Sequence, residues 1–182
     1  PQRMRAADRD RVLAACEAGA SSVHGSGINP GNLSGVLPLA LSGMSRTIEK
    51  ITLQERADWS VYESTGITFD NMAFGQPVEM ISPPTATEFL AFNSSIFEEQ
   101  VWFIGDALGG DLDEVTATVE AVAAQQDHQI FEHTLQAGTT AGQRWNWTGL
   151  RDGQPLVEIE TLWTVGGANT PGIGRCRNTD GR

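Results

Sequence analysis

The chain has 182 residues, which is enough for one domain with an added fragment. Its formal net charge of -11 argues against nucleic acid as a partner, because a phosphate backbone would be repelled over the whole surface. The sequence contains neither an apolar run of the roughly 18 residues that a membrane span needs nor a secretory signal, so we expect a cytoplasmic protein without a membrane partner.

Two helices and a long strand are predicted in the first third of the chain. Apolar residues at helical spacing predict a helix over Ala6–Ala18, and a short strand is expected over Ser21–His24. Ser34 is a candidate N-cap for a helix that runs to Ser42. The β-branched content of Arg46–Ala57 predicts the first long strand there.

The middle of the chain combines an irregular segment with the clearest helical pattern. Residues Trp59–Ile81 contain several aromatic side chains and show no regular period. A helix is predicted over Ile96–Leu108, with Ser95 and Glu98 as a capping box at its start. Gly109–Gly110 would end this helix.

Beyond this helix the hydrophobic period becomes two, which indicates strands. Val115–Ala121 alternates as a half-buried strand does. Thr139–Thr148 and Leu156–Val165 flank the dipeptide Asp152–Gly153, which is a strong hairpin signal. Residues 166–182 are rich in Gly, Pro, Asn and Arg, and we expect a disordered tail there.

These elements predict an α+β domain with a mixed, largely antiparallel open sheet and helices packed on one face. Trp145 and Trp147 should share one face of the hairpin, because strand side chains alternate. One helix of about 13 residues is roughly 20 Å long and would not cover these rings together with Trp163. We therefore expect the outer face of the hairpin to pair with a second copy, giving a homodimer.

A glycine-rich stretch, "HGSGINPGNLSG" at His24–Gly35, has the setting of a dinucleotide-binding loop. The fingerprint needs G-x-G-x-x-G, but here Gly31 comes one place late after Gly25 and Gly27. No acidic residue ends a second parallel strand about 20 residues later. The loop is therefore not predicted to bind the pyrophosphate. The Asn29 side chain has an amide donor and an amide acceptor, and a proline and a glycine follow it. Its two alternative roles are contact with a ligand and stabilisation of the turn.

This loop, together with "FDNMAFGQP" and "AGTTAGQRWNWTGLRDGQPLVEIETLW", resembles the C-terminal half of the 2,4-diaminopentanoate dehydrogenase-like family. That family includes the native amine dehydrogenases and is related in fold to dihydrodipicolinate reductase. The three blocks occur in the family's order, and the resemblance runs from Ala6 to Val165. The sequence departs from the family pattern at Asn32 and after Gly166.

The resemblance implies a two-part bacterial oxidoreductase for reversible oxidative deamination or reductive amination. An N-terminal Rossmann domain would bind NAD or NADP and supply the acidic catalytic residue, so no catalytic residue is assigned here. Residues 1–33 would be the last helix and strand of that domain with the crossover loop. Residues 34–165 would form the substrate-binding and oligomerisation domain, followed by the tail at 166–182. The chain alone is not expected to bind NAD(P)H tightly.

The candidate site residues follow from the same comparison. The nicotinamide end of the cofactor would face the loop residues Asn29, Gly27 and His24, although a hydrogen-bonded strand-end role is the alternative for His24. An apolar wall for an amine or ketone substrate would come from Tyr62, Trp59, Met72 and Phe74, with core packing as the alternative for each. No metal site is predicted, because the spacing of His128 and His133 fits no ligand set.

Two other functions remain open at this point. A dihydrodipicolinate reductase is disfavoured, because its His-His, Lys and Ser-Gly-Thr substrate motif is absent and Lys50 is the only lysine. A non-enzymatic domain that self-associates or binds a small ligand is the third possibility.

Overall fold

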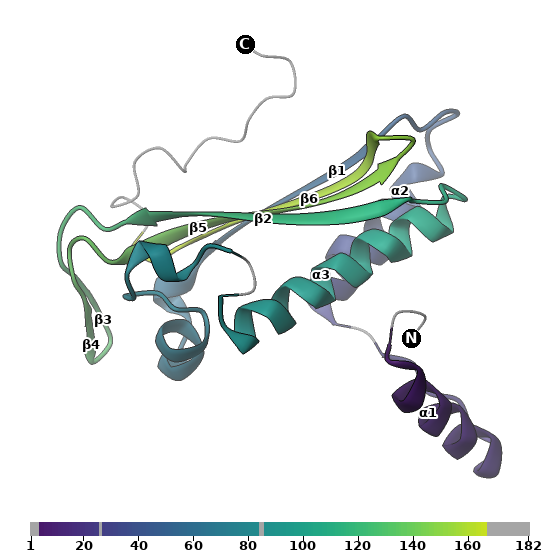
Figure 1. Cartoon of the computed structure of the whole chain (residues 1–182), viewed down its shortest axis with the longest axis horizontal. Helices are drawn as coiled ribbons and strands as arrows, with labels where there is room; N and C mark the ends of the chain where they lie inside the picture. Colours follow the sequence, from purple (N-terminus) through teal and green to yellow (C-terminus); the bar gives the residue numbers. More distant parts are fainter. Residues whose placement is uncertain (1–3, 26, 84–85, 167–182) are drawn as a thin grey trace.

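The computed structural model describes residues 4–25, 27–83 and 86–166, and its centre is a four-stranded sheet. The strands lie in the order β1 (Ile51–Asp58), β6 (Gln154–Thr164), β5 (Thr140–Arg151) and β2 (Glu114–Ala123). β1 runs parallel to β6, whereas β5 is antiparallel to both neighbours. The predicted α+β fold with a mixed, largely antiparallel open sheet is confirmed (Figure 1).

The helical segments gather on one face of this sheet. In Figure 1 the long helix α3 (Glu88–Ala107) crosses below the strands, beside the helical segment Ile28–Val36 and α2 (Leu37–Ser42). Three short helical turns follow β1: Trp59–Val61, Gly66–Asn71 and Val78–Met80. The strands β3 (His128–Ile130) and β4 (His133–Leu135) form a separate two-stranded ribbon. Within the described ranges no helix covers the opposite face of the sheet.

The β5–β6 hairpin forms where the sequence predicts it. Asp152 and Gly153 have φ of 53° and 72°, and a two-residue turn of this kind favours a glycine at its second position. Trp145 and Trp147 do share a face, but it is the face that α3 covers. Both rings are fully buried, and Trp163 is only 4% exposed. The expectation that these rings lie on an outer face open to a second copy is wrong.

Two elements supply the cover that the sequence analysis missed. α3 has 20 residues, and its Phe97 ring stacks on Trp147 with centroids 4.4 Å apart. The segment after β1 adds Trp59, whose ring meets the edge of Trp163 at 5.8 Å. A single chain therefore buries all three hairpin tryptophans.

The start of α3 differs from its prediction. Thr87 is the N-cap, because its side chain accepts a hydrogen bond from the Leu90 backbone N–H at 3.1 Å. Ser95 lies inside the helix, and its hydroxyl donates to the Phe92 carbonyl at 2.7 Å. The predicted capping box is therefore wrong. A Ser-x-x-Glu pattern also fits a helix interior, where serine can bond a carbonyl of the preceding turn.

The N-terminal third shows three further differences. Ser21–His24 is exposed and forms no strand, since none of the described strands lies beside it. Ser34 lies within the helical segment and accepts from the Gly31 N–H at 3.3 Å, so it is not an N-cap. β1 begins at Ile51 rather than Arg46, because Ile51 is the first residue that pairs with β6.

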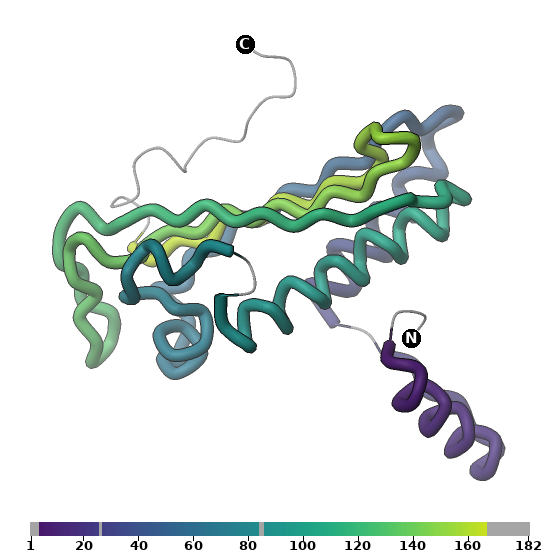
Figure 2. The backbone as a smooth tube through the Cα atoms, in the orientation of Figure 1, coloured from purple at the N-terminus to yellow at the C-terminus, as the bar shows by residue number. Residues whose placement is uncertain are grey.

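The first helix agrees with its prediction. α1 spans Ala6–Ala18, none of its residues is buried, and Figure 2 shows it standing away from the sheet. Its apolar residues Val12 and Leu13 are 36% and 53% exposed. Of the expected tail at 166–182, Gly166 is described and is buried, and the other residues lie outside the described ranges.

Candidate functional site

The aromatic wall predicted for a substrate begins where β1 ends. The Asp58 carboxylate accepts from the Ser60 N–H at 2.9 Å and from the Ser60 hydroxyl at 2.6 Å, which closes the turn Trp59–Val61. This turn leads Trp59 back over the covered face of the sheet. The Trp59 ring lies 5.1 Å from Tyr62 and 6.1 Å from Phe74, measured between centroids.

Trp59 and Tyr62 differ from the other wall residues in their accessibility. Tyr62 is 45% exposed. The Trp59 Nε1 atom is buried and has no hydrogen-bond partner among the described residues. Buried donors are normally paired, and an unpaired one costs about 1–3 kcal/mol. A ligand that accepts a hydrogen bond there would recover this energy.

Met72 and Phe74 lie deeper in the fold. They are 2% and 0% exposed and belong to the main hydrophobic core, which agrees with the packing alternative for both. The Met72 carbonyl accepts from Gln143 Nε2, and Gln143 Oε1 accepts from Trp145 Nε1 at 2.9 Å. This chain of bonds ties the wall to the hairpin. A direct contact of either side chain with a substrate stays a prediction.

The glycine-rich loop forms a compact turn before the segment Ile28–Val36. Gly31 has φ of 142°, a conformation that favours glycine, and a Cβ on Gly27 would lie 2.8 Å from the Pro30 carbonyl oxygen. The Gly27 carbonyl accepts from the Asn32 N–H at 2.8 Å. Asn29 Oδ1 is buried and has no partner within the described ranges. His24 is exposed, and no strand ends at it.

The loop and the aromatic wall lie on the same side of the sheet. The segment Ile28–Val36 packs on α3, where a Cβ on Gly35 would clash with Gln100. Trp59 packs on Trp163, which α3 also covers. No ring contact or hydrogen bond between described residues joins Asn29 to Tyr62. Their meeting in one crevice stays a prediction.

A carboxylate on the covered face of β1 was missed by the sequence analysis. The inward positions of this strand are Ile51, Leu53, Glu55 and Ala57, so a charged side chain stands in an otherwise apolar row. Glu55 Oε1 accepts from Trp163 Nε1 at 2.7 Å. The sequence does show a glutamate among the apolar, alternate positions of this strand. Which of the alternating positions face the core becomes clear only when β6 is known to be the neighbouring strand.

A hydroxyl group lies beside this carboxylate on the neighbouring strand. Thr161 pairs with Glu55 in the parallel β1–β6 register, and it is fully buried. Its Oγ1 atom has no hydrogen-bond partner in the described part of the chain. Side chains at paired positions stand about 4.8 Å apart across a sheet. Glu55 and Thr161 therefore present a polar pair at the edge of the aromatic wall.

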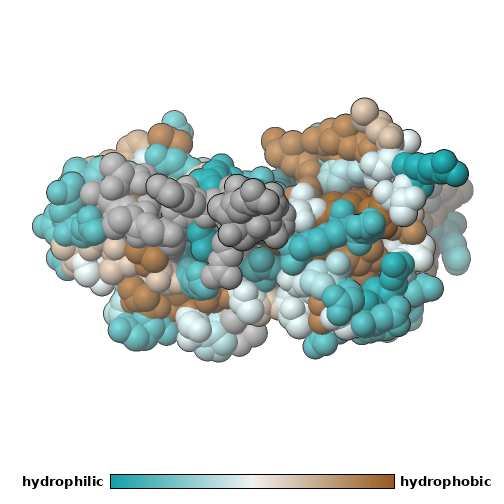
Figure 3. All heavy atoms as spheres, turned by 90° about the horizontal axis from the view of Figure 1, so that it is seen from above, coloured by the Kyte–Doolittle hydropathy of each residue, from teal (hydrophilic) through white to brown (hydrophobic). Residues whose placement is uncertain are grey.

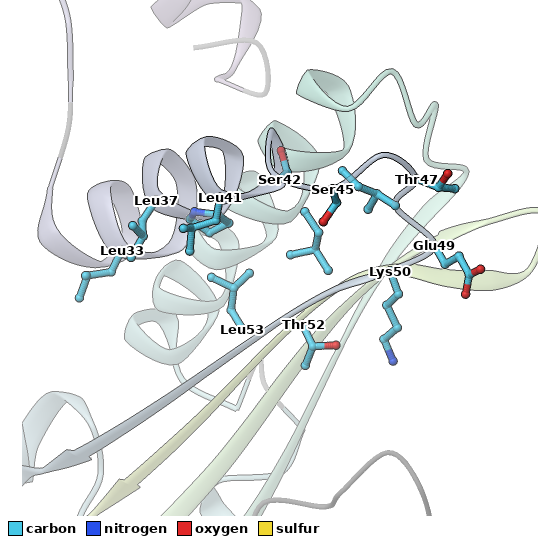
Figure 4. Close-up of a pocket in the computed structure, with 13 residues that line it drawn as sticks. Leu33, Leu37, Leu41, Ser42, Ser45, Thr47, Glu49, Lys50, Thr52 and Leu53 are labelled. Carbon is cyan, nitrogen blue, oxygen red and sulfur yellow. The ribbon is translucent and has the colours of Figure 1, made fainter.

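An open groove of about 650 Å³ runs between α2 and the first half of β1. Figure 4 shows Leu33, Leu37 and Leu41 on one side of the groove, with Leu53 pointing toward them and Lys50 pointing away. The inward position after Leu53 is Glu55, roughly 7 Å further along the strand. The lining of the groove combines leucines with polar residues and ends at Leu53, one inward position before Glu55.

The loop fits one end of a nicotinamide cofactor and not the whole of it. Asn29 Oδ1 is a buried acceptor without a partner, which suits the amide N–H₂ of a nicotinamide ring. The tight backbone at Gly27 leaves no side chain in the way. A pyrophosphate site needs a strand, a glycine turn and a helix in succession, and the described residues 21–25 and 27–36 do not form that arrangement.

The described residues contain neither a metal centre nor a membrane-spanning helix. No group of three or more His, Cys, Asp and Glu side chains could hold a metal ion there. His133 instead stacks on Phe69 with ring centroids 4.8 Å apart. None of the described helices is both long enough and apolar enough to cross a bilayer.

Comparison with known proteins places this chain in a family. The family model described as the 2,4-diaminopentanoate dehydrogenase C-terminal domain matches residues 34–165. An amine dehydrogenase of Streptomyces virginiae is 33% identical over 164 residues, which is 86% of this chain and 43% of that protein. The chain thus spans less than half the length of this relative.

A solved structure shares the fold. The amine dehydrogenase from Mycobacterium smegmatis superposes with a TM-score of 0.57 at 14% identity, covering 78% of this chain and 40% of the other. At this identity the likeness shows the fold alone. The family match covers most of the chain, and the chain therefore belongs to the 2,4-diaminopentanoate dehydrogenase C-terminal domain family.

Proposed function

We propose that this chain is the substrate-binding and subunit-pairing part of an NAD(P)-dependent oxidoreductase that acts on amines. The observation that carries the proposal is the family match over residues 34–165. Within this region, the covered face of the sheet brings the aromatic wall next to the Glu55 carboxylate. The reaction would be reversible oxidative deamination, with reductive amination of a ketone as its reverse. Both relatives are named as amine dehydrogenases, which supports this substrate class.

The residues of this chain would bind and orient the substrate. The Trp59 and Tyr62 rings offer an apolar surface, and excluding water from the reacting carbon favours chemistry over hydrolysis of an imine. The buried Trp59 N–H would donate a hydrogen bond to an acceptor on the substrate or the cofactor. Asn29 and Gly27 would hold the nicotinamide end. NAD(P)H, when bound, supplies the hydride.

Subunit pairing is proposed through the outer face of the β5–β6 hairpin. Its residues there are polar, among them Arg144, Asn146 and Thr148 of β5 and Glu160 of β6. In the coloured part of Figure 3, seen from above, hydrophilic and hydrophobic residues are mixed. A two-fold pairing would therefore be built on hydrogen bonds and ion pairs, with the tryptophans remaining in the core of each copy.

The test is to replace the matching region of the Streptomyces virginiae protein with this chain and to follow NADH or NADPH oxidation. Ketone with ammonium should support turnover. Tyr62→Ala should lower kcat/KM at least tenfold by removing part of the substrate wall, about 1.4 kcal/mol or more of transition-state stabilisation. Val61→Ala, at a neighbouring exposed position, is the matched control. A folded fusion that oxidises neither cofactor with any ketone would contradict the proposal.

A further inference from the structure

We infer that the groove between α2 and β1 is a docking site for a partner peptide, which binds as an added strand and carries basic side chains. One wall of the groove is the edge of β1 that faces away from β6, called here the far edge. The other wall is a leucine row, formed by Leu33, Leu37 and Leu41. This site does not depend on the proposed function, because its lining ends at Leu53 and the aromatic wall begins at Trp59.

The far edge of β1 has no strand beside it in the described part of the chain. β1 stands last in the strand order, and its pairing with β6 runs without a register shift over Ile51–Asp58. An edge strand presents unpaired N–H and C=O groups, which can pair with another extended chain. The opposite edge strand, β2, has a register shift between Val122 and Ala123, and such irregularities discourage pairing. The far edge of β1 is therefore the better place for an added strand.

The groove of about 650 Å³ reaches this far edge. Its lining includes every residue from 47 to 53, which are the approach to β1 and the first residues of the strand. Successive side chains of an extended chain point to opposite faces, so a space that touches all of them lies along the edge rather than over one face. At roughly 3.3 Å per residue this segment extends over about 20 Å, which gives room for a peptide of similar length.

The leucine row supplies the apolar wall. Its three side chains are exposed and recur every fourth residue, and Figure 4 shows them on one side of the groove with Leu53 pointing toward them. In a strand added to the far edge, every second side chain would point toward this row. A peptide brings both main-chain polar groups and apolar side chains, so it matches a lining in which leucines and polar residues are combined.

The charge at the groove favours a basic peptide. Glu49 is exposed, lies at the opposite end of the groove from Leu33 in Figure 4, and forms no ion pair with a described residue. Lys50 points away from the groove and is paired with Glu158 at 2.6 Å. The whole chain has a formal net charge of -11. A basic segment is therefore attracted to this groove, and an acidic one is repelled.

The measurement is the fluorescence anisotropy of a labelled synthetic peptide titrated with the full chain. In this peptide valine alternates with threonine, and a lysine stands at each end. Its dissociation constant should lie between about 1 μM and 1 mM. A copy with glutamine at both ends should bind about threefold more weakly. Two further copies are N-methylated, one at the valines and one at the threonines. One of them should bind at least tenfold more weakly than the other, because only one edge of the peptide pairs with β1.

Variants at exposed positions locate the site, with thermal unfolding as a check on the fold. Leu37→Gln should weaken the lysine peptide about tenfold, whereas Met44→Gln, outside the lining, should not change its affinity. Glu49→Gln should abolish the preference for lysine over glutamine ends, and Glu114→Gln, an exposed position of β2, should retain it. In hydrogen exchange, the peptide should slow backbone amides within residues 47–53.

Three results would overturn the inference: equal binding of the two N-methylated copies, full affinity in Leu37→Gln, or no binding of the lysine peptide up to about 1 mM. A second copy of the chain is the competing occupant, and a synthetic peptide with the sequence of residues 48–58 represents its β1. If that peptide binds more tightly than the lysine peptide, the groove is a contact between copies and the assignment to a basic partner falls.

Discussion

Ser94 joins the long helix to the sheet through a single hydroxyl group. Its Oγ accepts from Trp147 Nε1 at 2.9 Å and donates to Glu98 Oε1 at 2.8 Å. Ser94→Ala would leave a buried indole N–H without an acceptor, so we expect the free energy of unfolding to fall by about 1–3 kcal/mol in urea denaturation. Ser95→Ala, one residue along, should cost less than about 0.5 kcal/mol. Equal losses would show that the hydroxyl bridge is not what stabilises the helix against the sheet.

Single residues were harder to predict from the sequence than the elements that hold them. Trp59 and Tyr62 were predicted to lie close together, and their rings are in contact, while their role in a substrate site stays a prediction. Glu55 and Thr161 were missed, since which face a strand residue occupies depends on the partner strand and its register. The hairpin tryptophans were assigned to the wrong face for the same reason. Alternation shows which residues share a face but not which face is covered.

At the scale of elements, the N-cap of α3 gives a direct test. Thr87 accepts the Leu90 N–H, so Thr87→Ala should lower the free energy of unfolding by about 1 kcal/mol. Thr87→Asp should restore most of that loss, because aspartate caps equally well and its charge favours a helix N-terminus. Chemical denaturation followed by circular dichroism measures both variants. A neutral Thr87→Ala would mean that the helix is held by packing alone.

Element positions followed the sequence where the signal was local. The hairpin at Asp152–Gly153 and the helix Ala6–Ala18 form as predicted, because turn chemistry and helical spacing act over a few residues. The predicted strand Ser21–His24 is absent, and β1 begins later than expected. A strand needs a neighbour for its hydrogen bonds, and that neighbour is distant in sequence.

For the whole molecule, we expect no tight cofactor binding by this chain alone. The described residues include an Asn29 side-chain oxygen without a hydrogen-bond partner, but they lack the strand–turn–helix that binds a pyrophosphate. Titration with NADPH, followed by nucleotide fluorescence, should show no saturation in the micromolar range. A dissociation constant near 1 μM, about -8 kcal/mol, would refute this expectation.

Association tests the role of the outer sheet face. The chain should scatter light as a dimer at micromolar concentration, and Thr148→Arg on the outer face should shift it toward one chain by placing like charges across the two-fold axis. Ser95→Arg, on the exposed side of α3, is the control and should remain dimeric. A mass near one chain for the unaltered protein would rule out pairing through this face.

The central claim, that this chain binds the substrate of an amine-forming oxidoreductase, is tested most directly by the ammonium dependence of the fusion enzyme. With ketone and NAD(P)H present, the rate of cofactor oxidation should rise with ammonium to a plateau, and it should be at least tenfold lower without ammonium. The product should be the primary amine, identified by mass spectrometry. A rate that does not depend on ammonium, with an alcohol as product, would contradict the account.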